Sequence, residues 1–165
     1  MNADSIKTIQ KVLLAVNIFY MGRACKACCK YDAETAAVFA QIRDGFVARI
    51  GTAPGGAEIF VRSNDGEFEV CSPGRAPRPD LDIRFKNSDV ARKFFSGQKS
   101  LAACFSQGLT MTGGDTSQLM TLSRFFDLVA NYIMTKNFLR RNGRPLLKRN
   151  ANVHKLRFVT LFGRL

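Results

Sequence analysis

Tryptophan is absent from this 165-residue sequence, and histidine occurs once, at position 154. A nucleophilic triad with a histidine base would have to use His154, which lies in the tail beyond the main body of the chain. A carboxylate pair in a defined frame and a phosphate-binding glycine loop are also missing from the sequence. We therefore expect no catalytic residues, and binding is favoured over an enzymatic function.

We expect no leading signal peptide and no apolar run approaching the ~20 residues of a membrane-spanning helix. Its five cysteines are an odd number, which favours a reducing, cytoplasmic compartment over secretion. Cys25, Cys28 and Cys29 form a C-x-x-C-C pattern that could begin a metal site. The other cysteines and His154 lie far off without paired spacing, so free thiols are the preferred interpretation, with no metal and no cofactor.

Acidic residues are missing from one end of the chain. Residues 1–30 carry a net charge of +4, residues 31–135 of −1, and residues 136–165, which hold no acid, of +9, summing to +12. Clustered charge indicates a partner more than an even spread does. We expect an N-terminal amphipathic helix with a cysteine-rich connector over residues 1–32, a domain over residues 33–135, and a basic C-terminal extension over residues 136–165.

Hydrophobic periodicity predicts the elements of the domain. Apolar side chains at helical spacing indicate a helix over residues 4–22, with Ile9, Leu13 and Val16 on one side. Two alternating runs around Asp65-Gly66 predict a β-hairpin, because these residues suit the positive φ angles of a tight turn. The remaining expected elements are a second helix after Asp32, strands over residues 46–50, 81–86 and 109–112, helices over 88–97 and 100–107, and a long helix from 115 to near 141.

This order gives an α+β fold with a five-stranded, mostly antiparallel sheet covered by helices. The segment from Phe95 to Asp115 is distinctive within it, because a helix end, a short helix, a chain reversal and a strand follow one another closely. Together with Pro54-Gly55-Gly56 before the second strand and Ser88-Asp89 after the fourth, it resembles the sterol carrier protein 2 (SCP2) family of lipid-binding domains. The resemblance covers roughly residues 33–135. The sequence departs from the family in lacking a lysine after Gln107-Gly108.

The resemblance implies a non-enzymatic domain with an apolar tunnel between sheet and helices, which binds sterols, fatty acyl groups or other lipids. Some bacterial members are accessory factors of isoprenoid quinone synthesis. Matching positions place Phe105 and Gln107 at the corner of the tunnel and Leu109 and Met111 on its floor. Helical facing adds further candidates on the long helix. The ligand-binding residues expected in full are Phe105, Gln107, Leu109, Met111, Leu119, Met120, Leu122 and Phe126.

The basic C-terminal extension mixes lysine and arginine with leucine and phenylalanine, which suits attachment to an anionic membrane surface. The membrane contacts expected are Arg140, Arg141, Arg144, Lys148, Arg149, Lys155 and Arg157. Aromatics interleave with these residues only faintly, which favours a membrane over nucleic acid. The alternatives left open are a solvated tail, a basic nucleic-acid-associated protein, and an accessory subunit whose wide apolar last helix docks on a protein partner such as a lipid or quinone biosynthesis enzyme.

Overall fold

The computed structural model describes residues 3–52, 56–71, 74 and 77–163, and the side chains of residues 3–7, 10 and 11 are not described. Pro54 and Gly55 of the expected chain break lie outside the described residues. The elements are α1 (Ala3–Tyr31), α2 (Ala33–Phe39), β1 (Val47–Thr52), β2 (Glu58–Asn64), β3 (Glu67–Cys71), β4 (Leu81–Phe85), α3 (Ser88–Phe95), α4 (Leu101–Ser106), β5 (Thr110–Gly114), α5 (Leu119–Ile133), α6 (Lys136–Arg141) and α7 (Val153–Phe162). The expected α+β class is confirmed.

The five strands form one sheet in the order β3-β2-β1-β4-β5. β1 and β4 are parallel, and the other neighbouring pairs are antiparallel. The predicted hairpin is confirmed, because Asn64 pairs with Glu67 and leaves a two-residue loop. Asp65 and Gly66 both have positive φ angles, 49° and 77°, as a type I′ turn requires.

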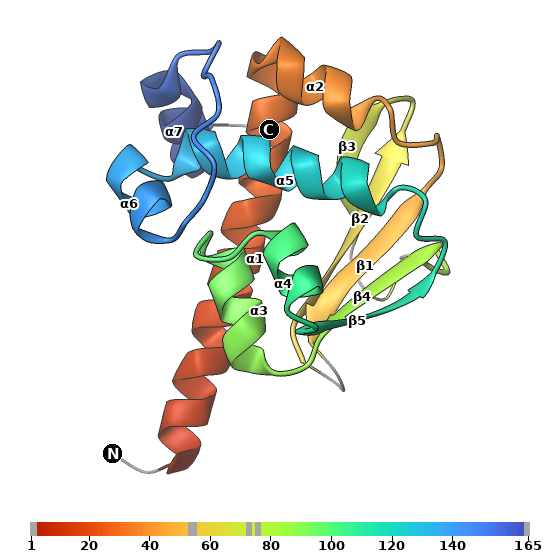
Figure 1. Cartoon of the computed structure of the whole chain (residues 1–165), viewed down its shortest axis with the longest axis vertical. Coiled ribbons are helices and arrows are strands. Elements are labelled where there is room, and N and C mark those ends of the chain that lie inside the picture. Colours follow the sequence, from red (N-terminus) through yellow and green to blue (C-terminus); the bar gives the residue numbers. More distant parts are fainter. Residues whose placement is uncertain (1–2, 53–55, 72–73, 75–76, 164–165) are drawn as a thin grey trace.

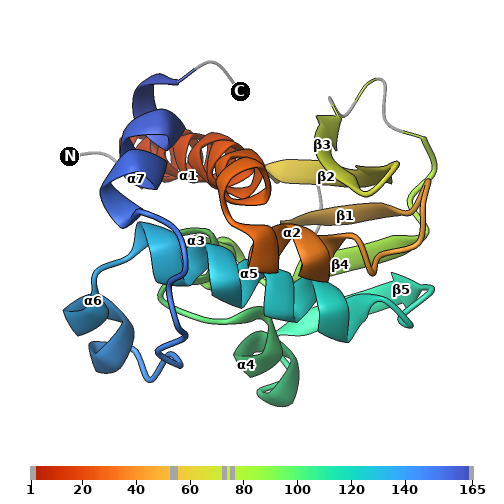
Figure 2. The ribbon, with the colours of Figure 1, turned by 90° about the horizontal axis from the view of Figure 1, so that it is seen from above.

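The helices gather on one face of this sheet (Figures 1 and 2). Alternate residues of the strands point to that face, so Ile50, Ile59 and Ile83 are buried beneath the helices. Phenylalanines fill much of the interior. Rings of Phe39, Phe68 and Phe125 contact one another, and a second group is formed by Phe85, Phe94, Phe95 and Phe126.

Helix α1 is longer than the sequence pattern indicates. We expect it to end near Gly22, but it continues to Tyr31 through the cysteine-rich connector. Cys25 and Cys28 are fully buried, so packing outweighs the low helix propensity of glycine. By length and composition Val12–Tyr31 could cross a membrane, which corrects the expectation that no run is long and apolar enough. The second half of that segment is part of the core.

The C-terminal region is folded against the domain. The long helix expected to reach residue 141 ends at Ile133, because Met134 is extended (ψ 154°) and the side chain of Thr135 caps α6 as a new helix. Helix α7 is not expected from the sequence, whose basic and apolar residues lack a clean period there; it packs against α1 and α5. The expected division into residues 1–32, 33–135 and 136–165 stays a prediction, although buried side chains of all three segments share one core.

Candidate functional site

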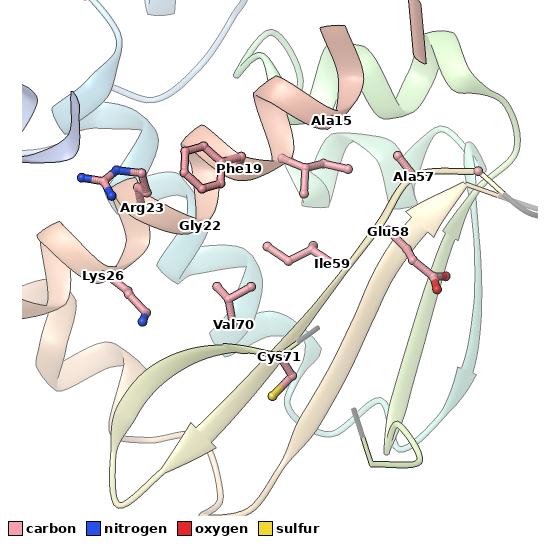
Figure 3. Close-up of a pocket in the computed structure, with 12 residues that line it drawn as sticks. Ala15, Phe19, Gly22, Arg23, Lys26, Ala57, Glu58, Ile59, Val70 and Cys71 are labelled. Atoms are coloured by element: carbon pink, nitrogen blue, oxygen red, sulfur yellow. The ribbon is translucent and has the colours of Figure 1, made fainter. Parts of the chain in front are cut away.

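A groove lies between α1 and the edge of the sheet formed by β2 and β3 (Figure 3). Its cavity measures about 690 Å³, within the range of small-molecule sites. The lining residues are Ala15, Ile18, Phe19, Gly22, Arg23, Lys26, Gly56, Ala57, Glu58, Ile59, Val70 and Cys71. We call this cavity the α1/β3 groove.

The walls of the groove are apolar and come from both layers. Ile18 of α1 lines the groove. Phe19 projects from the same helix, while Ile59 and Val70 extend from β2 and β3 toward it (Figure 3). Ile59 is 5% exposed, whereas Phe19 is 69% and Val70 42% exposed. The groove therefore has a buried apolar floor and apolar side chains at an open mouth.

Gly22 determines how closely the helix approaches the strands. A Cβ atom at this position would lie 3.1 Å from Val70 Cγ2 and 3.6 Å from Ile59 Cδ1. Any larger side chain would occupy the space that the groove now leaves open. The same glycine weakens the helical pattern of the sequence, which is why the pattern ends there.

Three charged residues line the groove, and two of them form hydrogen bonds with other groups of the protein. The Arg23 guanidinium donates hydrogen bonds to the carbonyl oxygens of Thr160 (2.6 Å) and Gly163 (2.5 Å) at the end of α7. The Glu58 carboxylate accepts a hydrogen bond from Arg49 Nε (2.9 Å). Lys26 has no hydrogen-bond or ion-pair partner among the described residues. Its ammonium group is thus available to an anionic group in the groove.

A second cavity, of about 540 Å³, lies farther along α1 and β3. It is more polar, because Lys30, Glu67 and Glu69 line it along with Lys26 and Phe68. Lys26 belongs to both cavities, so it stands at the junction of an apolar and a polar compartment. This arrangement suits a molecule with an apolar body and a charged end.

The cysteine cluster is placed for packing. Cys25 and Cys28 are fully buried, and burial raises the pKa of both thiols well above the usual range. Burial also raises the pKa of Cys29 to about 12, so this thiol carries little of the thiolate that binds metals. Within the described part of the chain, no group of three or more His, Cys, Asp or Glu side chains is positioned to hold a metal ion.

The predicted ligand residues lie elsewhere, and none of the eight lines the α1/β3 groove. Leu122 and Phe126 are buried in the closely packed core, and Phe105, Leu109 and Leu119 pack against it. Gln107 is exposed and accepts a hydrogen bond from Lys99 Nζ (2.7 Å). Met120 is 72% exposed and borders a smaller cavity of about 220 Å³ between α5 and Leu147.

The register of β5 against β4 determines the face of the sheet on which Met111 lies. It pairs with Arg84 across β4 and β5, whereas buried Ile83 pairs with Thr112. Because strand residues alternate between faces, Met111 points away from the helices and Thr112 points toward them. The role of these eight residues in ligand binding stays a prediction.

The predicted membrane contacts also divide into two sets. Arg144 is buried and ion-paired with Asp127 Oδ1 at 2.6 Å, so it is not available to a surface. Arg149 and Arg157 each donate to the Met134 carbonyl oxygen at 2.9 Å, just past the C-terminus of α5. The exposed members are Arg140, Arg141, Lys148 and Lys155.

Sequence reasoning missed the contribution of α1 to a site. The available signal was its apolar character on more than one side, with Val12, Ile18 and Phe19 widening the stripe. A helix that is apolar on more than one side covers more than one surface. The groove itself could not be expected, because it depends on how α1 crosses an edge strand distant in the sequence.

Comparisons with known proteins return related folds. No protein-family model and no curated protein sequence matches the chain. A solved structure named UbiJ-SCP2 Ubiquinone synthesis protein is 14% identical and covers 58% of this chain and 77% of its own, with a TM-score of 0.41. The sterol carrier protein domain 2 of Helicoverpa armigera is 23% identical and covers 70% of this chain and 89% of its own, with a TM-score of 0.47. SCP2 domains are thus among the solved structures similar to this chain, and the likeness concerns the fold alone.

Proposed function

We propose that this protein binds a lipid of the fatty acyl, sterol-like or isoprenoid kind in the α1/β3 groove and presents it at a membrane surface. The observation that carries the proposal is the apolar groove of about 690 Å³ with an uncommitted lysine at one end. Sites of this volume bury most of a small ligand, and a few placed polar groups orient it.

The side chains that line the groove support binding of a ligand rather than catalysis. Glu58 is held by Arg49, and Arg23 is held by the end of α7. What remains is an apolar surface and the Lys26 ammonium group. A ligand with one hydrocarbon body and a carboxylate or phosphate head would match both, since the body displaces water from Ile59 and Val70 while the head pairs with Lys26.

Filling the groove tests this proposal. We expect wild type to bind a fluorescent fatty acid, and Gly22→Leu to bind it at least ~10-fold more weakly, a loss of about 1.4 kcal/mol. The leucine side chain would occupy the space between α1 and Val70. Ala37→Leu, on the exposed side of α2, is the matched control. Circular dichroism monitors folding of both variants, and equal affinities of Gly22→Leu and wild type would refute the groove as the site.

The corner around Phe105 and Met111, which the sequence predicts as the lipid site, is the competing location for the ligand. Phe105→Glu and Met111→Glu should abolish uptake if a tunnel opens there. If the α1/β3 groove is the site, Met111→Glu binds the fatty acid like wild type, because Met111 lies on the opposite face of the sheet. A loss of binding in Met111→Glu with an intact fold would instead favour the corner.

A further inference from the structure

Exposed apolar side chains concentrate on two neighbouring helices. Of the twelve large apolar residues exposed in the described part of the chain, eight lie on α1 or α7. They are Ile9, Val12, Leu13, Val16 and Phe19 on α1, and Phe158, Leu161 and Phe162 on α7. We call these eight residues the α1/α7 face.

The two groups adjoin each other at Arg23. Helices α1 and α7 lie side by side in both views (Figures 1 and 2) and contact each other. The Arg23 guanidinium lies 5.9 Å from the Phe19 ring centroid and donates to the Gly163 carbonyl oxygen at the end of α7. Phe158 and Phe162 contact each other, with ring centroids 5.4 Å apart. Arg23 therefore connects Phe19, at one end of the exposed group on α1, to the C-terminal end of α7, next to Phe162.

We propose that the α1/α7 face inserts shallowly into the interface of an anionic lipid bilayer. Phenylalanine and aliphatic side chains at 48% to 74% exposure leave apolar area in water that a bilayer would cover. Amphipathic helices that lie in a membrane plane present such residues beside lysine and arginine. Besides these apolar residues, helices α1 and α7 carry Arg23, Lys26, Lys30, Lys155 and Arg157, and no acidic side chain is described on either helix.

Charge selects a bilayer over a second copy of the chain as the occupant. The segments that carry the face, residues 1–30 and 136–165, have net charges of +4 and +9. Two copies meeting at this face would bring like charges together, which opposes association. An anionic bilayer attracts the same charge, at about 1 kcal/mol per basic residue near the surface.

The geometry indicates shallow insertion and excludes a crossing by α1 as folded here. The exposed apolar residues of α1, from Ile9 to Phe19, span about 15 Å along the helix, against a hydrocarbon thickness of about 30 Å. The next part of α1 is fixed in the core, where Cys25, Ala27 and Cys28 are fully buried. A crossing would require this part of the helix to leave the core.

Insertion would also place the groove at the membrane. Phe19 belongs to both the α1/α7 face and the α1/β3 groove. A lipid could then pass between bilayer and groove with little exposure to water. This consequence rests on the proposed function, whereas the insertion itself does not.

Fluorescence gives a direct test, because the chain contains no tryptophan. Phe162→Trp is mixed with vesicles of phosphatidylcholine and about 30% phosphatidylglycerol, with and without brominated acyl chains. We expect a blue shift and quenching by the brominated lipid. Met120→Trp, at a position 72% exposed against 74% for Phe162, should show neither. Equal quenching of both variants, or none in Phe162→Trp, would overturn the proposal.

A second pair of measurements separates insertion from ligand binding. Phe158→Ser with Phe162→Ser should weaken vesicle partitioning by at least ~10-fold, as expected for losing buried phenylalanine contacts. Neither residue lines the groove, so fatty acid binding should be retained. Some wild-type partitioning should survive high salt, which screens charge but not apolar contacts. Complete loss of wild-type binding in salt, or unchanged partitioning of the double variant, would contradict insertion.

Discussion

At the scale of residues, charge alone does not identify the functional basic side chains. Arg144, Arg149 and Arg157 are three of the nine basic residues after position 135, yet all three hold the fold together. Lys26 stands in a segment of lower charge and has no partner in the described structure. A lysine without a structural role is the better candidate for binding an anionic group, because pairing it with a ligand breaks no existing contact.

The buried pair of Asp127 and Arg144 gives a residue-scale prediction. Asp127→Asn leaves the Arg144 guanidinium, 4% exposed, without its counter-charge, and we expect a loss of about 3 kcal/mol in the free energy of unfolding. Asp89→Asn is the control, because Asp89 pairs with Arg92 and Lys93 at a surface where it is 53% exposed. The control should cost under ~1 kcal/mol. Urea denaturation compares the two, and similar midpoints would contradict the structural role of the buried pair.

At the scale of elements, the Tyr132 side chain of α5 joins the C-terminal segment to the start of α2. The Tyr132 hydroxyl donates to Asp32 Oδ1 (2.8 Å), the N-cap of α2, and accepts from the backbone N–H groups of Asn150 (2.8 Å) and Ala151 (3.2 Å). Three segments far apart in the sequence thus meet at one oxygen. This junction positions the start of α7 and so contributes to the α1/α7 face.

Removing that oxygen should loosen the segment. Tyr132→Phe leaves two backbone N–H groups and Asp32 without their shared partner, and we expect a destabilisation of about 1–3 kcal/mol. Hydrogen exchange should quicken at Asn150 and Ala151. Tyr31→Phe, which keeps the ring near Lys155 Nζ, is the control, and an equal effect of the two variants would rule out the junction.

Some elements of this fold could be predicted from the sequence more completely than others. The hairpin at Asp65-Gly66 was predictable because local turn chemistry and alternation determine it. The full length of α1 was not, since tertiary packing of Cys25 and Cys28 outweighs the glycine at position 22. The face on which Met111 lies depends on the pairing of β5 with β4, and a shift of one residue reverses it. Local patterns thus predicted the fold class and left the groove unseen.

At the scale of the whole molecule, the α1/β3 groove and the α1 part of the α1/α7 face lie along one helix. Helix α1 contributes one half to the core, one side to the groove and its protruding part to the surface. The apolar residues of a 29-residue helix thereby serve three environments. This division accounts for the breadth of its apolar pattern, which a single packing partner would not require.

The central claim is that an apolar ligand occupies the α1/β3 groove, and one labelling measurement tests it directly. Val70→Cys, in a Cys71→Ser background, places a thiol on the groove wall, and its alkylation is followed by mass spectrometry with and without oleate. At ten times the dissociation constant, oleate should slow alkylation roughly tenfold, while alkylation of Met120→Cys stays unchanged. Equal rates for Val70→Cys with and without bound oleate would contradict the account.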